Sequence, residues 1–135
     1  MPRDHVAINK AVGEADARIW AAAGARLWQA PQPEWGNWGQ PEAALHLLPE
    51  DMTGMDAIEL GCGTAYVSGW MVRRGARATA IDVSPAQLAT ARDLAARPGG
   101  AITLNTGNAA AAGSPDAPFA LTISALRAAL PCPAV

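Results

Sequence analysis

Two glycines and an aspartate near the middle of the chain have a spacing typical of nucleoside binding. Gly61 and Gly63 flank Cys62 in residues 58–66, which have the pattern of a strand, a tight turn and a helix start. Glycines let a ligand approach the backbone, and a helix N-terminus offers N–H donors to an anion. Asp82 lies nineteen residues beyond Gly63, at the end of the next predicted strand. A carboxylate at that point can accept hydrogen bonds from both hydroxyls of a ribose.

Alternating strands and helices are predicted to position these residues. Gly75 suits a left-handed helix end, and Ser84 followed by Pro85 suits a helix start. Right-handed crossovers give the strand order 3-2-1, and the fourth strand returns beside the first. The expected fold is therefore α/β: a partial, Rossmann-like, doubly wound parallel sheet of order 3-2-1-4 with an N-terminal helical cap. Its ligand site is expected at the topological switch point, beyond the carboxyl ends of the first and fourth strands. The expected strands are residues 56–60, 77–81, 101–104 and 119–124, and the expected helices are 65–74 and 85–97.

The N-terminal region differs from the rest of the chain in composition. Four of the five tryptophans lie in the first 38 residues. An apolar repeat at helical spacing predicts an amphipathic helix over 12–28, and a short helix is expected at 42–48. We expect residues 1–50 to form a helical cap or lid, 51–124 a ligand-binding half-domain, and 125–135 an atypical proline-containing tail. The stripe expected to be buried comprises Val12, Ala15, Ile19, Ala23 and Leu27.

The tryptophans of this region allow two interpretations. Trp20 and Trp28 lie eight residues apart on one predicted helix, so packing of that helix onto the domain is favoured. Trp35 and Trp38 lie on a proline- and glycine-rich loop, where packing and a lid over the site stay equally open. The basic run at residues 73–77 is interpreted as the solvated end of a helix, where cations oppose the dipole.

Composition excludes several classes of function. A chain of 135 residues with 50% apolar and 16% charged residues predicts one folded domain. A net charge of -2 gives no reason to expect nucleic acid as a partner. No apolar run has the length of a membrane span, so we expect a soluble, cytoplasmic chain without a membrane partner. Cys62 and Cys132 belong to no metal or disulfide motif, and His5 and His46 have no partner pattern.

The glycine segment resembles a known family signature. Glu59-x-Gly61-x-Gly63-x-Ala65 is similar to the acid-x-Gly-x-Gly-x-Gly motif of class I S-adenosylmethionine (SAM) dependent methyltransferases, with alanine at the last glycine. A dinucleotide fingerprint would need a third glycine at Tyr66, which disfavours NAD. The resemblance continues through residues 80–88, 107–109 and 114–121.

This resemblance implies a role for each matched position. Glu59 would orient the loop or the amino group of SAM, Asp82 would hold the ribose, and Ser124 would lie near the methyl group. Asn108 stands where the family has an acid that receives the adenine amino group. The implied reaction is an in-line displacement at the sulfonium methyl, with no required catalytic base and no metal. The implied cofactor contacts are Glu59, Gly61, Cys62, Gly63, Asp82, Val83, Asn108, Ala109 and Ser124.

The resemblance covers residues 41–124, whereas the family's domain continues for three more strands. Three interpretations stay open: a methyltransferase acting on an unidentified small-molecule acceptor, with its acceptor half missing or supplied by another chain; a truncated, inactive remnant; or a nucleotide-binding or interaction module. The fourth strand, with Leu121 and Ile123, would leave an edge open to self-association.

Overall fold

A four-stranded parallel sheet forms the centre of the fold. The computed structural model describes residues 4–36, 38–96, 102–109 and 119–124. Its sheet has the order β5-β4-β3-β6, which is the predicted 3-2-1-4. The predicted tail at 125–135 lies outside the described residues. The strands are β3 (Asp56–Leu60), β4 (Arg77–Asp82), β5 (Ile102–Thr106) and β6 (Leu121–Ile123).

The register of the strands aligns their carboxyl ends. Leu60 of β3 pairs with Ile81 of β4, and Asp82 pairs with Thr106 of β5. On the other side of β3, Glu59 pairs with Ile123 of β6. Because all these strands are parallel, the residues that follow them meet at one edge of the sheet. That edge receives the glycine loop, the end of β4, the segment after β5 and Ser124.

Helices α3 (Tyr66–Arg73) and α4 (Pro85–Ala95) connect the first three strands of this sheet. Ser84 caps α4 as predicted, since its side chain accepts a hydrogen bond from the Gln87 N–H. Gly75 follows α3 with a φ of 101°, the left-handed geometry expected there. Both crossovers advance in the same direction across the sheet, so right-handed connections place both helices on one face. Met71 of α3 and Leu88 of α4 are fully buried.

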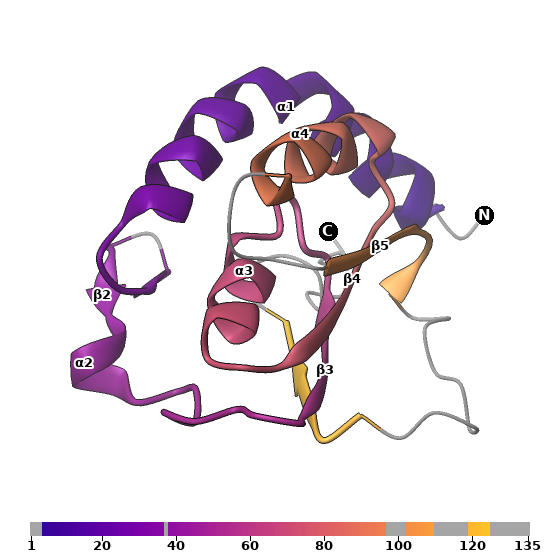
Figure 1. The fold of residues 1–135 in the computed structure, drawn as a ribbon. Coiled ribbons are helices and arrows are strands. Elements are labelled where there is room, and N and C mark those ends of the chain that lie inside the picture. The colour runs from indigo at the N-terminus through magenta and orange to yellow at the C-terminus, as the bar shows by residue number, and fades with distance from the viewer. Residues whose placement is uncertain (1–3, 37, 97–101, 110–118, 125–135) are drawn as a thin grey trace.

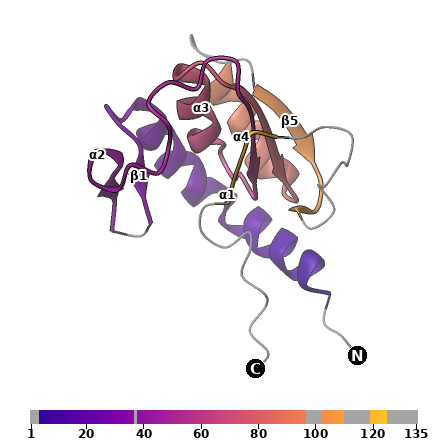
Figure 2. The same cartoon turned by 90° about the horizontal axis from the view of Figure 1, so that it is seen from below.

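Helix α1 (His5–Gln29) begins earlier than predicted, because Asp4 accepts hydrogen bonds from the Val6 and Ala7 N–H groups. It curves over α4 at the top of the view in Figure 1 and contacts both α4 and α3. Figure 2 shows the same helix crossing beneath α3 and α4. No helix in the described part of the chain has the length and hydropathy needed to cross a bilayer.

The predicted buried stripe on α1 is wrong. Val12 and Ile19 keep 44% and 68% of their surface exposed, and the buried residues of the helix are Gly24 and Trp28. Glycine makes the close contact: a Cβ at Gly24 would lie 2.5 Å from the Thr64 hydroxyl oxygen. The helix packs through Gly24 and Trp28, which leaves Val12 and Ile19 of the apolar stripe outside the core.

A small hairpin follows α1. It pairs β1 (Glu34–Trp35) with β2 (Gln40–Pro41), and α2 (Glu42–Leu45) follows, shorter than predicted. Trp35 is buried and therefore packs, whereas Trp38 is 88% exposed. Of the two interpretations left open for this pair, packing holds for Trp35. It does not hold for Trp38.

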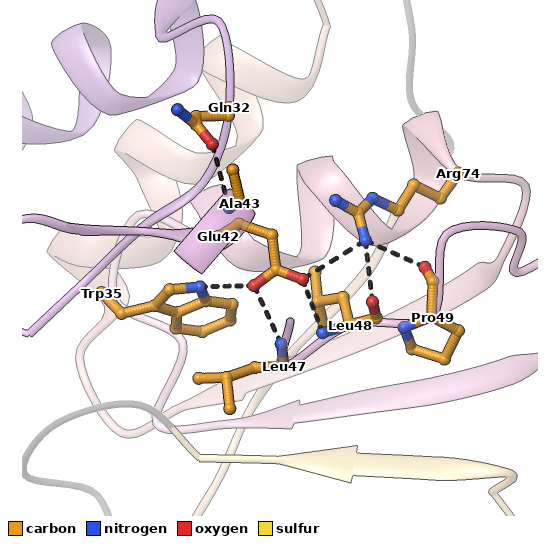
Figure 3. A network of polar contacts seen from close by, with 8 residues as sticks. All are labelled: Gln32, Trp35, Glu42, Ala43, Leu47, Leu48, Pro49 and Arg74. Carbon is orange, nitrogen blue, oxygen red and sulfur yellow. Dashed lines mark hydrogen bonds and ion pairs between the residues drawn. The ribbon is translucent and has the colours of Figure 1, made fainter. Parts of the chain in front are cut away.

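The buried Glu42 carboxylate joins this region to the end of α3 (Figure 3). It accepts hydrogen bonds from the Trp35 indole at 2.7 Å and from the N–H groups of Leu47 and Leu48 at 3.1 and 2.8 Å. Burial alone would raise the pKa of Glu42, but these bonds hold it below its usual value. Arg74 bonds Glu42 and the Leu48 carbonyl, so the prediction that this arginine is solvated is wrong.

Candidate functional site

A cavity of about 950 Å³ lies beyond the carboxyl ends of the strands. Its walls come from α1, the β1–β2 hairpin, the glycine loop and the segments after β4, β5 and β6. This volume lies near the upper end of the range of about 300–1,000 Å³ found for small-molecule sites. All nine sequence-predicted site residues line it: Glu59, Gly61, Cys62, Gly63, Asp82, Val83, Asn108, Ala109 and Ser124.

The glycine loop turns through three residues in the left-handed region. Gly61, Gly63 and Ala65 have φ values of 65°, 54° and 58°. The Cys62 N–H donates to the Ile81 carbonyl at 2.9 Å, which ties the loop to the end of β4. Glycine adopts this conformation without a steric cost because it has no Cβ. Ala65 has a Cβ, so the left-handed conformation costs it about 1–2 kcal/mol. The backbone of Gly61 and Gly63 is consequently open to a ligand in the cavity.

Asp82 holds the glycine loop in this shape. One oxygen of its carboxylate accepts from the Gly63 N–H at 2.8 Å, and the other accepts from the Ser84 N–H at 2.8 Å. Each carboxylate oxygen has a second lone pair for another donor. Asp82 therefore positions the loop, and its oxygens can also accept hydrogen bonds from a ligand.

Glu59 lies at the buried base of the cavity. Its carboxylate accepts hydrogen bonds from the Ser68 N–H at 2.9 Å and from the Ser68 hydroxyl at 2.5 Å. These bonds satisfy a donor in the first turn of α3, for which no cap side chain is present. Burial raises the pKa of Glu59 to about 7, the Ser68 bonds oppose this rise, and the negative charge of Asp82 adds to it.

The other predicted residues occupy the rim and floor. Cys62 is buried, and burial raises the pKa of its thiol far above the usual value, so it is not an activated nucleophile. Asn108 and Ala109 follow β5 on the same cavity wall as Asp82's strand end. The Ser124 hydroxyl donates to the Leu60 carbonyl at 3.3 Å, beside the start of the glycine loop.

The lining also includes side chains that the sequence did not predict, among them Gln87, Tyr66 and Trp20. Gln87 is 6% exposed, and its Oε1 has no hydrogen-bond partner in the described part of the chain. Its position one turn after the Ser84 cap was the available signal. Tyr66 exchanges hydrogen bonds with the backbone of Glu34, which fastens the hairpin to the start of α3. Trp20 also lines the cavity, although the sequence favoured packing for this residue.

Comparison with known proteins identifies the family. The methyltransferase domain family model matches residues 57–134, more than half of the chain. Magnesium-protoporphyrin O-methyltransferase from Rhodobacter capsulatus is 32% identical over 101 residues, which cover 69% of this chain and 45% of that protein. The chain thus spans less than half the length of this curated relative.

Solved structures give the same result. An S-adenosylmethionine dependent methyltransferase from Mesorhizobium loti is 30% identical, with a TM-score of 0.51 over 61% of this chain and 36% of that one. A TehB-like SAM-dependent methyltransferase from Corynebacterium glutamicum, 20% identical, shares the fold, with a TM-score of 0.57 over 82% of this chain and 55% of that one. The glycine loop and Asp82, the acid at the end of β4, both line the cavity. The chain belongs to the class I SAM-dependent methyltransferase domain family.

Proposed function

We propose that this chain binds S-adenosylmethionine in the cavity and forms the cofactor-binding part of a methyltransferase that acts on a small-molecule acceptor. The observation that carries the proposal is convergence: residues from four separate segments, each chosen by its sequence motif, line one cavity. Membership of the methyltransferase domain family supports SAM as the cofactor.

The residues present fit this cofactor. Gly61 and Gly63 present backbone without side chains, so the methionine part of SAM can approach closely. Asp82 supplies carboxylate oxygens for the ribose hydroxyls, Val83 follows it on the same wall, and the Asn108 side chain offers a carbonyl acceptor for an adenine amino group. When bound, SAM supplies an activated methyl group.

The chain's own residues bind, orient and exclude water in this proposal. Glu59 fixes the first turn of α3, which follows the glycine loop. Helix α1 and the hairpin cover the cavity opposite the strand ends. We therefore assign residues 1–50 as a cap over the cofactor and 51–124 as the part that holds it. No general base is required, because alignment of donor and acceptor supplies most of the catalysis.

Isothermal titration calorimetry with S-adenosylhomocysteine (SAH), SAM and NAD tests the cofactor assignment. The chain should bind SAH and SAM at micromolar concentration or tighter and show no heat with NAD. Asp82→Ala should lose about 1–3 kcal/mol of that affinity because the ribose loses its charged acceptor. Asp93→Ala, an exposed acid on α4 outside the cavity, is the matched control and should bind as the wild type does.

Two results would contradict this proposal. Equal SAH affinity in Asp82→Ala and wild type would remove the ribose assignment. A folded wild-type chain that binds neither SAH nor SAM would favour the inactive remnant or an interaction module of the same fold.

A further inference from the structure

The exposed apolar face of α1 has no packing partner in the domain core, yet it lines the cavity. Val12, Trp20, Ala23 and Leu27 all contribute to the wall. The Trp20 indole is 39% exposed, so much of its ring is accessible to a ligand. An accessible tryptophan in a cavity wall provides a large, flat and mostly apolar contact surface.

The contacts of α1 place this face relative to the proposed cofactor. Glu14 accepts hydrogen bonds from the Ser84 hydroxyl at 2.6 Å and from the Ala86 N–H at 3.1 Å, so the first half of α1 lies at the start of α4, beside Asp82. Gly24 lies against Thr64 in the glycine loop. Trp20 is one helical turn before Gly24, on the stretch of α1 between these two contacts, and its side chain lines the cavity.

The hairpin adds small residues to the cavity wall. Gly36 and Gly39 line it, and a Cβ at Gly36 would meet no atom within 4 Å, so the space beside this residue is open. Arg26 and Glu34 are the charged residues contributed by α1 and the hairpin at this end, and they pair with each other at 3.4 Å. The two charges sum to zero, so α1 and the hairpin give this end of the cavity no net charge.

We propose that this end of the cavity, between Trp20 and the β1–β2 hairpin, binds the methyl acceptor and selects a planar, uncharged aromatic molecule. The inference rests on the proposed function, since the acceptor must reach the glycine loop and Ser124 where the methyl group would lie. Trp20 is the specificity-determining residue: its indole stacks on the ring of the acceptor. The apolar side chains of Val12 and Leu27 extend this contact.

Fluorescence titration of the chain with N-phenyl-1-naphthylamine, a planar uncharged aromatic probe, tests this inference in the presence of saturating SAH. The wild type should bind the probe at one saturable site. Trp20→Ala should bind it at least tenfold more weakly, and Trp20→Phe should stay within about threefold because a ring remains. Trp38→Ala is the matched control, since this indole is 88% exposed and outside the cavity lining, and it should leave probe affinity unchanged.

Several outcomes would overturn the inference. Equal probe binding by Trp20→Ala and wild type would remove the stacking role, as would an equal loss in Trp38→Ala. Displacement of the probe by SAH would place it in the cofactor end instead. If 1-nonanol displaces the probe as well as 2-naphthol does, the site selects flexible chains instead of rings.

SAH affinity separates this inference from the proposed function. It should be the same in the wild type and in all three tryptophan variants, because Trp20 is assigned to the acceptor alone. Failure of the wild type to bind SAH contradicts the proposed function. Normal SAH binding together with probe binding that is independent of Trp20 contradicts only the acceptor assignment.

Discussion

The substitution Gly63→Ala separates the backbone strain of the glycine loop from its role in binding. Gly63 has a φ of +54°, and a Cβ there would lie 3.9 Å from the Gln87 Oε1, with no closer neighbour. The methyl group would therefore fit into the unliganded protein. It would, however, occupy space in the cavity where we expect the cofactor to approach the backbone.

Gly54→Ala is the matched control. Gly54 has a φ of +73°, a Cβ there would also meet nothing within 4 Å, and the residue lies outside the cavity lining. An alanine in the left-handed region costs about 1–2 kcal/mol, partly offset by a less flexible unfolded chain. We expect a net loss of about 1 kcal/mol in both variants, which corresponds to about 4 °C in Tm for a domain of this size.

The two variants should differ in ligand affinity. Calorimetric titration with SAH should show at least a tenfold loss for Gly63→Ala, equivalent to about 1.4 kcal/mol, and less than a twofold change for Gly54→Ala. Differential scanning calorimetry of the same samples gives the stability change. If Gly63→Ala binds SAH like the wild type while losing as much stability as Gly54→Ala, the loop is a structural turn, and the assignment of Gly63 to cofactor binding is refuted.

Three further predictions concern the elements around the site. The folded pKa of Glu59, about 7, lies above its ordinary 4.5, so the free energy of unfolding should fall as pH rises between these values; Glu59→Gln should abolish this slope in urea titrations, and an unchanged slope would assign it elsewhere. Gly24→Ala should cost about 1–3 kcal/mol despite better helix propensity, because the Cβ would lie 2.5 Å from Thr64; a higher Tm would show that α1 does not pack this closely. Glu42→Ala should lose about 3 kcal/mol in chemical denaturation by leaving buried donors such as the Trp35 indole unpaired, and a loss below about 1 kcal/mol would refute the network in Figure 3.

The site residues that come directly after the strands could be predicted from local sequence. Parallel strands joined by helices align their carboxyl ends, so the motif around Gly61 and the acid at Asp82 had to meet at one edge. Ser84 and Gly75 specified helix ends through their own local chemistry. The hydrogen bond that the Gly63 N–H donates to Asp82 was not predicted, because the direction of a side chain depends on its neighbours in space.

The opposite wall of the site depended on tertiary structure. An apolar repeat in α1 identifies a helix with one apolar face, but the same repeat serves a face that packs on a core and a face that lines a cavity. Close contacts at Gly24 and Trp28 decided the orientation and turned Val12 and Trp20 toward the cavity. Arg74 was decided in the same way, because its partner Glu42 lies 32 residues away in the chain. The sequence by itself determined the sheet order, the helix ends and the cofactor-side motifs, since each depends on local backbone preferences and the handedness of the chain. Only the folded structure decided which side chains face the cavity, since that depends on contacts between segments far apart in sequence.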